Sequence, residues 1–421
     1  MTDTRLTDKA SSVGVDWFFP SLRSSFSPLP SFPPQRNDPP MEVFMTEKTT
    51  TLESILTGLW EDTFGFSPIG PQDDFFELGG HSLHAASLIT KIRTLTGCDL
   101  PIASFLHAPT IELLAQVIRT GEAVTSSSLV ILREGNRERG LFIAHSLAGT
   151  VFELWALARE MDCHCAVYGI QARGLREGEV SNNSVEDMAV DYVEQIRAVQ
   201  PHGPYALAGF SLGGLIAFEM AQRMLQSGEK VELLALVDSH VDEQCLTFPA
   251  WLAQQRRRAA LELREIRARS RRERVRYVFA KATQLADRLR IIAGKTPKRS
   301  GLNEQTFGEL TLPPNLRRII VGLRVAMAAY RPKPYAGKVM FFQSTIRNPR
   351  WANPLGVWKR VCQGGLEVVI VAGAHNDLLL PPMVAYVARA LNRLLDVKNP
   401  GRESELQRKP SVEDKLAHEL S

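Results

Sequence analysis

The sequence predicts a multidomain fold, in which a small all-helical domain precedes an α/β domain with a mostly parallel sheet. The chain has 421 residues, which is long for a single hydrophobic core. Residues 47–121 place apolar side chains at helical spacing, whereas residues 131–397 alternate short apolar runs with amphipathic helices. This alternation is typical of a parallel sheet covered by helices.

Three segments of the first domain carry the helical pattern. Residues 51–65 and 82–97 repeat apolar residues every three or four positions. Residues 110–121 form a shorter segment, with Thr110 as the predicted N-cap and Gly121 as the predicted stop.

The second domain is predicted from strands and helices that follow each other along the chain. Strands are predicted at residues 140–146, 164–171, 205–210, 231–238, 337–344 and 366–373. Helices are predicted at residues 150–161, 184–200, 212–228 and 383–397. Residues 241–330 show a helical pattern without a strand, so we interpret them as a helical insertion in this domain.

Three further segments are predicted to lie outside the two domains. Residues 1–46 are rich in proline and serine, which indicates a disordered arm, although a true start at Met41 or Met45 is an equally open interpretation. Residues 122–130 are a polar linker, and residues 398–421 are a charged tail.

Composition excludes several classes of function. A net charge of +4 is small for this length, and no aromatic interleaving accompanies the basic residues, so no nucleic-acid partner is expected. No apolar run is long enough for a transmembrane helix, and the N-terminus lacks a signal-peptide pattern. Five scattered cysteines indicate a reducing compartment, and no second pair complements Cys163 and Cys165 at metal-ligand spacing. We therefore expect a cytoplasmic protein without membrane or metal.

Ser211 lies at the centre of a G-x-S-x-G motif, Gly209 to Gly213. The motif is weak by itself, but a predicted strand precedes it and a predicted helix follows it. A sharp turn at such a junction exposes the serine hydroxyl, and its glycines permit strained, closely packed backbone. Ser211 is the predicted nucleophile.

A serine nucleophile needs a base and a group that orients the base. On this type of fold, the acid and then the histidine follow the serine along the chain. Asp238 ends one strand and His375 follows another, so both are predicted at the edge of the sheet that holds ligand sites. Asp238 would orient the imidazole and His375 would take the serine proton. Other acidic and histidine side chains fit this order less well: Asp242, Glu243, Asp377, His164 and His240.

Negative charge on a reacting carbonyl oxygen calls for two hydrogen-bond donors. One donor is predicted at the backbone N–H of Leu212, directly after the nucleophile. The second is assigned to the N–H of Leu147, in the turn "HSLAG" after the first core strand.

At this point the motifs resemble a known pair of domains. "DDFFELGGHSL" and "FLHAPTIELLA" resemble the peptidyl carrier domain of nonribosomal peptide synthetases. "LFIAHSLAGTVFEL", "GFSLGG", "LALVDSH", "AYRPKPYAGKVMFF" and "GAHNDLL" resemble the type I thioesterase domain that ends those assembly lines. The resemblance covers residues 47–396 and implies a four-helix carrier domain, followed by an α/β-hydrolase domain with a helical lid.

The resemblance also implies a cofactor, because the serine of G-G-H-S-L in such carrier domains receives a 4′-phosphopantetheine arm. That serine is Ser82 in this chain, and a phosphopantetheinyl transferase would attach the arm. A helix that starts at Ser82 would favour a phosphate through its N–H groups and dipole. The alternative is that Ser82 serves only as a helix N-cap.

The chain departs from the family pattern in three respects. The usual H-P-x-G-G motif has Ser146 for proline and Ala148 for glycine, which leaves the detail of the oxyanion turn open. The 46 residues before the carrier region do not resemble an adenylation or condensation domain, so trans-acting synthetase subunits are expected to load the acyl or peptidyl group. The insertion is also unusually basic.

Charge is distributed unevenly between the two domains. Residues 256–290 contain thirteen Arg/Lys and four Asp/Glu, whereas residues 47–119 contain four basic and nine acidic residues. One interpretation is a solvated helical face. The other is that the basic insertion attracts the carrier domain and its arm.

The predicted function is that of a carrier–thioesterase didomain. It would release an acyl or peptidyl group from the arm through a Ser211 ester, by hydrolysis or cyclisation. Two alternatives stay open. In the first, the enzyme passes the acyl group to a separate acceptor or clears it from misloaded carriers. In the second, the chain is a carrier and docking module with an inactive thioesterase half.

Overall fold

The computed structural model describes residues 51–80, 82–98, 100, 103–120, 127–175, 179–276 and 314–396. They fall into two compact units, Met1–Ser126 with Ala259–Arg318 and Ser127–Arg258 with Ile319–Ser421. This division runs through the predicted insertion. The predictions for the arm, the tail, most of the linker and residues 277–313 lie outside the described residues.

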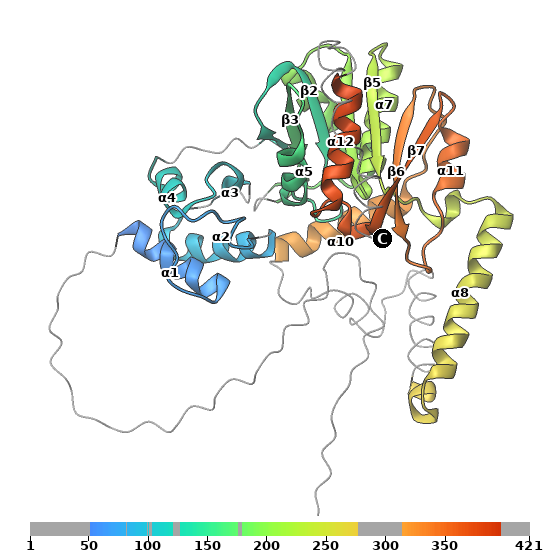
Figure 1. Ribbon diagram of the computed structural model, residues 1–421, viewed down its shortest axis with the longest axis horizontal. Coiled ribbons are helices and arrows are strands. Elements are labelled where there is room, and N and C mark those ends of the chain that lie inside the picture. Colours follow the sequence, from blue (N-terminus) through green and yellow to red (C-terminus); the bar gives the residue numbers. More distant parts are fainter. Residues whose placement is uncertain are drawn as a thin grey trace, which may run out of the picture. The chain divides into compact units, whose positions relative to one another are not determined.

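The first unit contains the four short helices that the resemblance implied (Figure 1). They are α1 (Leu52–Phe64), α2 (Ser82–Thr96), α3 (Ser104–His107) and α4 (Ile111–Thr120). Three aromatic side chains, Trp60, Phe75 and Phe105, are fully buried between them. The ring centroid of Phe75 lies 5.6 Å from that of Trp60 and 4.6 Å from that of Phe105. Aromatic contacts thus form part of the core of this small unit, together with buried aliphatic side chains such as Leu56, Leu88 and Leu114.

The ends of these helices follow from individual residues. The Thr51 hydroxyl accepts a hydrogen bond from the N–H of Ser54 at the start of α1, and Gly65 ends α1 with a φ of 76°. The Thr110 hydroxyl accepts from the N–H of Leu113, so the predicted N-cap of α4 is confirmed.

The second unit contains a seven-stranded sheet in the order β1-β3-β2-β4-β5-β6-β7. The strands are β1 (Leu129–Arg133), β2 (Asn136–Ala144), β3 (Cys165–Ile170), β4 (Tyr205–Phe210), β5 (Val231–Val237), β6 (Val339–Ile346) and β7 (Leu366–Ala374). All neighbours pair in parallel except β1 and β3, which are antiparallel. The mostly parallel sheet was predicted, but β1 was not, and it begins inside the predicted linker.

Helices connect the parallel strands, and one further helix, α12, follows the last strand. They are α5 (Trp155–Glu160), α6 (Val185–Val199), α7 (Leu212–Gln226), α8 (Phe248–Ala268), α10 (Pro314–Ala329), α11 (Leu355–Val361) and α12 (Met383–Asp396). Helices α5 and α12 pack together (Figure 1), and α6 and α7 form a second packed pair. Short 3₁₀ turns occur at Phe152–Leu154, Glu243–Cys245 and His375–Asp377.

Strand β4 is the centre of this unit. All six of its residues are buried, which is expected for a parallel strand with both faces covered. The strand order reverses between β2 and β4, because the chain goes from β2 to β3 on one side and returns to β4 on the other. Ligands of open α/β sheets bind at the carboxyl ends of strands beside such a reversal.

The described part of the predicted insertion is helical. Residues 241–276 and 314–330 contain a 3₁₀ turn, α8 and α10, and no strand is assigned in these two ranges. Strand β6 resumes the sheet directly beside β5. The insertion therefore interrupts the chain between two neighbouring strands without separating them.

Candidate active site

Ser211 occupies the sharp turn between β4 and α7. Its φ of 57° and ψ of −116° are strained for a residue with a side chain. Its N–H donates a hydrogen bond of 2.9 Å to the carbonyl of Val237, which ties the turn to β5. A Cβ added at Gly209 would lie 2.0 Å from the Gly213 carbonyl oxygen, and one at Gly213 would lie 2.2 Å from that of Ala144. Both motif glycines are therefore required by close backbone packing, as predicted.

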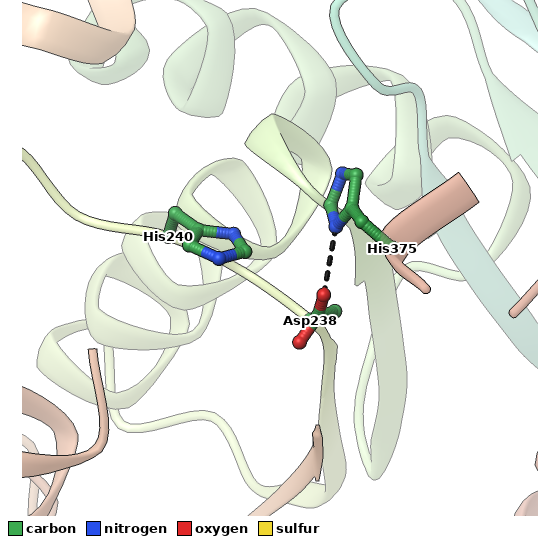
Figure 2. A group of neighbouring side chains, drawn as sticks. All are labelled: Asp238, His240 and His375. Carbon is green, nitrogen blue, oxygen red and sulfur yellow. Dashed lines mark hydrogen bonds and ion pairs between the residues drawn. The ribbon is translucent and has the colours of Figure 1, made fainter. Parts of the chain in front are cut away.

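Asp238 and His375 are brought together from positions 137 residues apart. Asp238 follows β5 with a φ of 46°, and its Oδ2 lies 2.8 Å from His375 Nδ1 in the turn after β7 (Figure 2). The Asp238 carboxylate also accepts hydrogen bonds from the N–H and the hydroxyl of Ser344, at 3.1 and 2.9 Å. The side chains of the pair are both buried.

The charge of Asp238 follows from these donors. Burial acts to raise the pKa of its carboxyl group, but the hydrogen bond from His375, with nearby imidazole charge and the Ser344 N–H, lowers the pKa to about 2. An ionised carboxylate can only accept hydrogen bonds, so His375 Nδ1 carries the shared proton. The other ring nitrogen of a neutral His375, Nε2, is then an acceptor.

Aromatic rings surround the His375 imidazole. The ring of Phe210, next to Ser211, stacks on it with centroids 4.8 Å apart and an interplanar angle of 24°. Trp351 and His240 meet it edge to face, at 5.6 and 5.2 Å. The stacking of Phe210 places the imidazole beside the Ser211 turn. Among the described residues, no hydrogen bond joins the Ser211 hydroxyl to His375.

His240 was not predicted to belong to this site, because it lies on a different segment from the expected histidine. The structure nevertheless places it beside Asp238 and His375 (Figure 2). Its side chain is buried, and burial, with the nearby His375, lowers its pKa to about 4. Its Nδ1 has no hydrogen-bond partner. The signal in the sequence was its closeness to Asp238, two residues along the chain, at the carboxyl end of a predicted strand.

Asp238, His240 and His375 also form a group that could hold a metal ion, with one ligand atom from each within 4.8 Å of the others. Two of these atoms already hydrogen bond to each other, and Asp238 is further satisfied by Ser344. A metal ion would have to replace that bond. The arrangement therefore fits a hydrogen-bonded acid–base pair better than a metal centre.

The other acidic residues considered as partners of His375 have different contacts. The Asp377 carboxylate accepts the N–H of Ala374 at 2.8 Å and so caps the turn that holds His375. Asp242 accepts the N–H of Gln244 at 2.9 Å. His164 is exposed, at the start of the segment that enters β3.

The two predicted oxyanion donors lie at the ends of adjacent strands. Leu147 follows β2 and Leu212 is the first residue of α7, after β4. No hydrogen bond within the described residues uses either backbone N–H as its donor. Ala148 has no positive φ, so alanine is compatible with its position, whereas Gly149 has a φ of 73° and needs glycine.

Ser82 is the first residue of α2, a helix of 15 residues without an acidic residue in its first turn. The preceding turn contains Gly79, with a φ of 88°, and Gly80, where a Cβ would lie 2.3 Å from the Phe75 carbonyl oxygen. This backbone can only be built with glycine at both positions. The first turn of α2 offers backbone N–H groups and no carboxylate, so its residues fit a phosphopantetheine group.

Comparison with known families agrees with this geometry. Residues 139–395 match the thioesterase domain family, which is more than half of the chain. The chain belongs to the thioesterase domain family. Residues 54–118 match the phosphopantetheine attachment site family, so the helical unit is a carrier domain for covalent 4′-phosphopantetheine. The thioesterase domain contains the whole seven-stranded sheet except β1 and the first three residues of β2.

The curated relatives of this carrier–thioesterase chain are much longer proteins. Malpinin synthetase of Mortierella alpina is 30% identical over 83% of this chain, which is 4% of that protein. The dimodular nonribosomal peptide synthase of Bacillus subtilis (strain 168) is 31% identical over 83% of this chain and 14% of its own length. The chain therefore spans only a small part of these relatives.

Among solved structures, a four-domain nonribosomal peptide synthetase bound to AMP and glycine aligns over 89% of this chain and 27% of its own. Its sequence identity is 24% and the TM-score is 0.49. Because that score is below 0.5, the assignment of the chain to its families rests on the family matches and the curated relatives.

In the ranges that the structure describes, no helix has the length and apolar character needed to cross a bilayer.

Proposed function

We propose that this chain is the carrier and release unit of a nonribosomal peptide synthetase, with Ser211, His375 and Asp238 as its catalytic triad. The observation that carries the proposal is the buried hydrogen bond between His375 and Asp238, in a chain that matches both a carrier and a thioesterase family. The Ser211 turn lies on the neighbouring strand, at the reversal of the strand order. The names of the relatives support peptide synthesis as the context.

The carrier serine and the nucleophile have separate tasks in this proposal. Ser82 holds the 4′-phosphopantetheine group, which supplies a thiol that can carry an acyl or peptidyl group as a thioester. Ser211 attacks the thioester carbonyl and forms an ester with the acyl group. Its hydroxyl is activated only when a base removes the proton.

The proton moves through His375. Asp238 keeps the proton of the imidazole on Nδ1, so Nε2 accepts the proton of Ser211 and Asp238 stabilises the imidazolium that results. His375 would give that proton to the departing thiol of the arm, and its neutral imidazole would then activate water, or an amine or hydroxyl of the acyl or peptidyl group, to attack the ester. The N–H groups of Leu147 and Leu212 stabilise the negative carbonyl oxygen in both steps.

Phosphonate labelling of the full chain tests the nucleophile. We expect an alkyl fluorophosphonate to add one phosphonyl group to the wild type and none to Ser211→Ala. Ser227→Ala is the matched control, because that exposed serine caps the other end of α7 and should leave labelling unchanged. An unlabelled wild type would favour the alternative of a carrier module with an inactive thioesterase half.

Intact mass tests the carrier serine. Incubation with coenzyme A and a phosphopantetheinyl transferase should add one phosphopantetheine to the wild type and to Ser87→Ala, which alters an exposed serine of the same helix. Ser82→Ala should gain none. An arm on Ser82→Ala would reject the assignment.

The partners follow from the same proposal. A phosphopantetheinyl transferase attaches the arm, and other synthetase modules, such as adenylation and condensation domains, supply the acyl or peptidyl group. Transfer to a separate acceptor is the alternative to hydrolysis or cyclisation. Product mass from a loaded carrier, with and without an added amine, separates the two outcomes.

A further inference from the structure

Hydrogen bonds to Ser146 fix the turn that carries the Leu147 N–H. The Ser146 N–H donates a hydrogen bond of 2.9 Å to Oε1 of Glu153, which lies in the 3₁₀ turn before α5. The Ser146 carbonyl oxygen lies 2.6 Å from His145 Nδ1 and also accepts the Gly149 N–H. Its hydroxyl accepts the N–H of Ala148 at 3.2 Å. These bonds hold every polar group of Ser146.

The orientation of Ser146 determines where the Leu147 N–H points. A peptide unit is planar and trans, so the Ser146 carbonyl and the Leu147 N–H point in opposite directions within one plane. His145 fixes that carbonyl: a carbonyl oxygen only accepts, so Nδ1 is the donor, and Nε2 then accepts from the hydroxyl of Tyr192 at 2.9 Å. Glu153 fixes the preceding peptide unit through the Ser146 N–H. The two together leave the Leu147 N–H little freedom to turn.

Glu153 is an unusual residue to find under such a turn. Burial raises the pKa of its carboxyl group to about 7, while the Ser146 hydroxyl and N–H act against that shift. A carboxyl group in such a position is costly unless donors face it. Ser146 supplies the donor because it is not proline, the residue that the thioesterase motif usually has there and which has no N–H. Ser146 and Glu153 are therefore complementary.

We propose that Glu153 is a positioning residue for catalysis, which acts through the Ser146 N–H to aim the Leu147 N–H at the reacting carbonyl oxygen. This inference rests on the proposed function, since it needs Ser211 to form a tetrahedral intermediate. Glu153 touches neither substrate nor nucleophile in this role. It replaces, with a hydrogen bond, the rigidity that a proline ring would give the turn.

A double-mutant cycle on the full chain tests the proposal. The variants are Ser146→Pro, Glu153→Leu and the pair together, with a small acyl thioester as substrate. Each single variant leaves one enclosed polar group without its partner, so we expect kcat to fall roughly 10- to 100-fold with KM within about threefold. The double variant removes both groups and should recover about tenfold over the worse single variant.

Two further variants separate positioning from general stability. Glu153→Gln keeps an oxygen acceptor for the Ser146 N–H and should keep kcat within about fivefold of the wild type. Glu160→Gln, at an exposed carboxylate at the end of α5, is the matched control and should have no effect. Thermal unfolding is recorded for each variant, so that a loss of folded protein is not read as a loss of kcat.

The outcomes are distinct. Additive losses in the cycle, a Glu153→Leu variant with wild-type kcat, or a Glu153→Gln variant as slow as Glu153→Leu would overturn the role of Glu153. A wild type that neither hydrolyses the thioester nor reacts with a phosphonate would instead reject the proposed function. Phosphonate labelling of the wild type therefore accompanies the cycle.

Discussion

The hydrogen bond between His375 and Asp238 gives the sharpest prediction, for the variant Asp238→Asn. The pKa of the Asp238 carboxyl group falls from 3.8 to about 2 in the folded chain. At roughly 1.4 kcal/mol per pKa unit, the ionised form gains about 2 kcal/mol from its surroundings on folding. The amide keeps an oxygen for Ser344 but turns an N–H₂ group toward His375, so the imidazole loses the acceptor that holds its proton on Nδ1.

Two measurements follow from this change. The kcat for a small thioester should fall by roughly 10⁴, the loss expected when the imidazole adopts the wrong tautomer. The free energy of unfolding at pH 7 should fall by about 2 kcal/mol. Because the pKa of Asp238 is lowered by folding, the wild type has this stabilisation above pH 4 and loses it as the pH falls toward 2. The difference in stability between the two proteins should shrink by roughly half at pH 3.

The control is Ser344→Ala, which removes one donor to Oδ2 but leaves the Ser344 N–H on Oδ1 and His375 in place. We expect about 1 kcal/mol of lost stability and less than a tenfold loss of kcat. A kcat of Asp238→Asn within threefold of the wild type would refute the reasoning, and so would a stability difference that is the same at pH 7 and pH 3.

The remaining predictions concern other parts of the chain. Ser82→Ala should keep the hydrolysis of a small thioester while losing all release from its own carrier, as measured by product mass after loading. Gly213→Ala should lower the melting temperature sharply, because its Cβ would meet a carbonyl oxygen of β2, whereas Gly356→Ala, with open space around it, should not; calorimetry of the two compares them directly. Reversing the exposed Arg264 and Arg267 of α8 to Glu should slow release from a separately supplied carrier and weaken its salt dependence. Steady-state rates between low and high salt test this, and an equal loss on a small thioester would contradict it.

The strands around the site were predicted well because each one is a short apolar run, and β4 and most of β5 are also buried. The bounds predicted for β4 agree with the structure, and β5 and β7 each differ by one residue at the C-terminal end. Their carboxyl ends carry Ser211, Asp238 and His375, and a parallel sheet brings such ends to one edge. The order of elements was thus enough to predict which residues would come together.

Other features depend on contacts that a single sequence does not reveal. Strand β1 is short and ends in arginine, and its antiparallel pairing with β3 has no signal in the strand–helix alternation. The hydrogen bond from Ser146 to Glu153 could not be predicted, because nothing in the sequence marks Glu153 as the partner of the Ser146 N–H. His240 was set aside because the prediction considered strand ends alone, although the chain bends at Asp238 after β5 and the His240 ring comes to lie 5.2 Å from that of His375.

The strained backbone at Ser211 and Asp238 has a consequence for how this protein can change over generations. They are the two residues other than glycine with positive φ in the described part of the chain, and glycine would relax either of them by roughly 1 kcal/mol or more. At Asp238 that gain is smaller than the roughly 2 kcal/mol contributed by its ionised carboxylate, so a change to glycine stabilises the fold only at Ser211. Descendants that no longer need release chemistry should therefore lose the Ser211 side chain first, and keep Asp238 and the sheet that holds it.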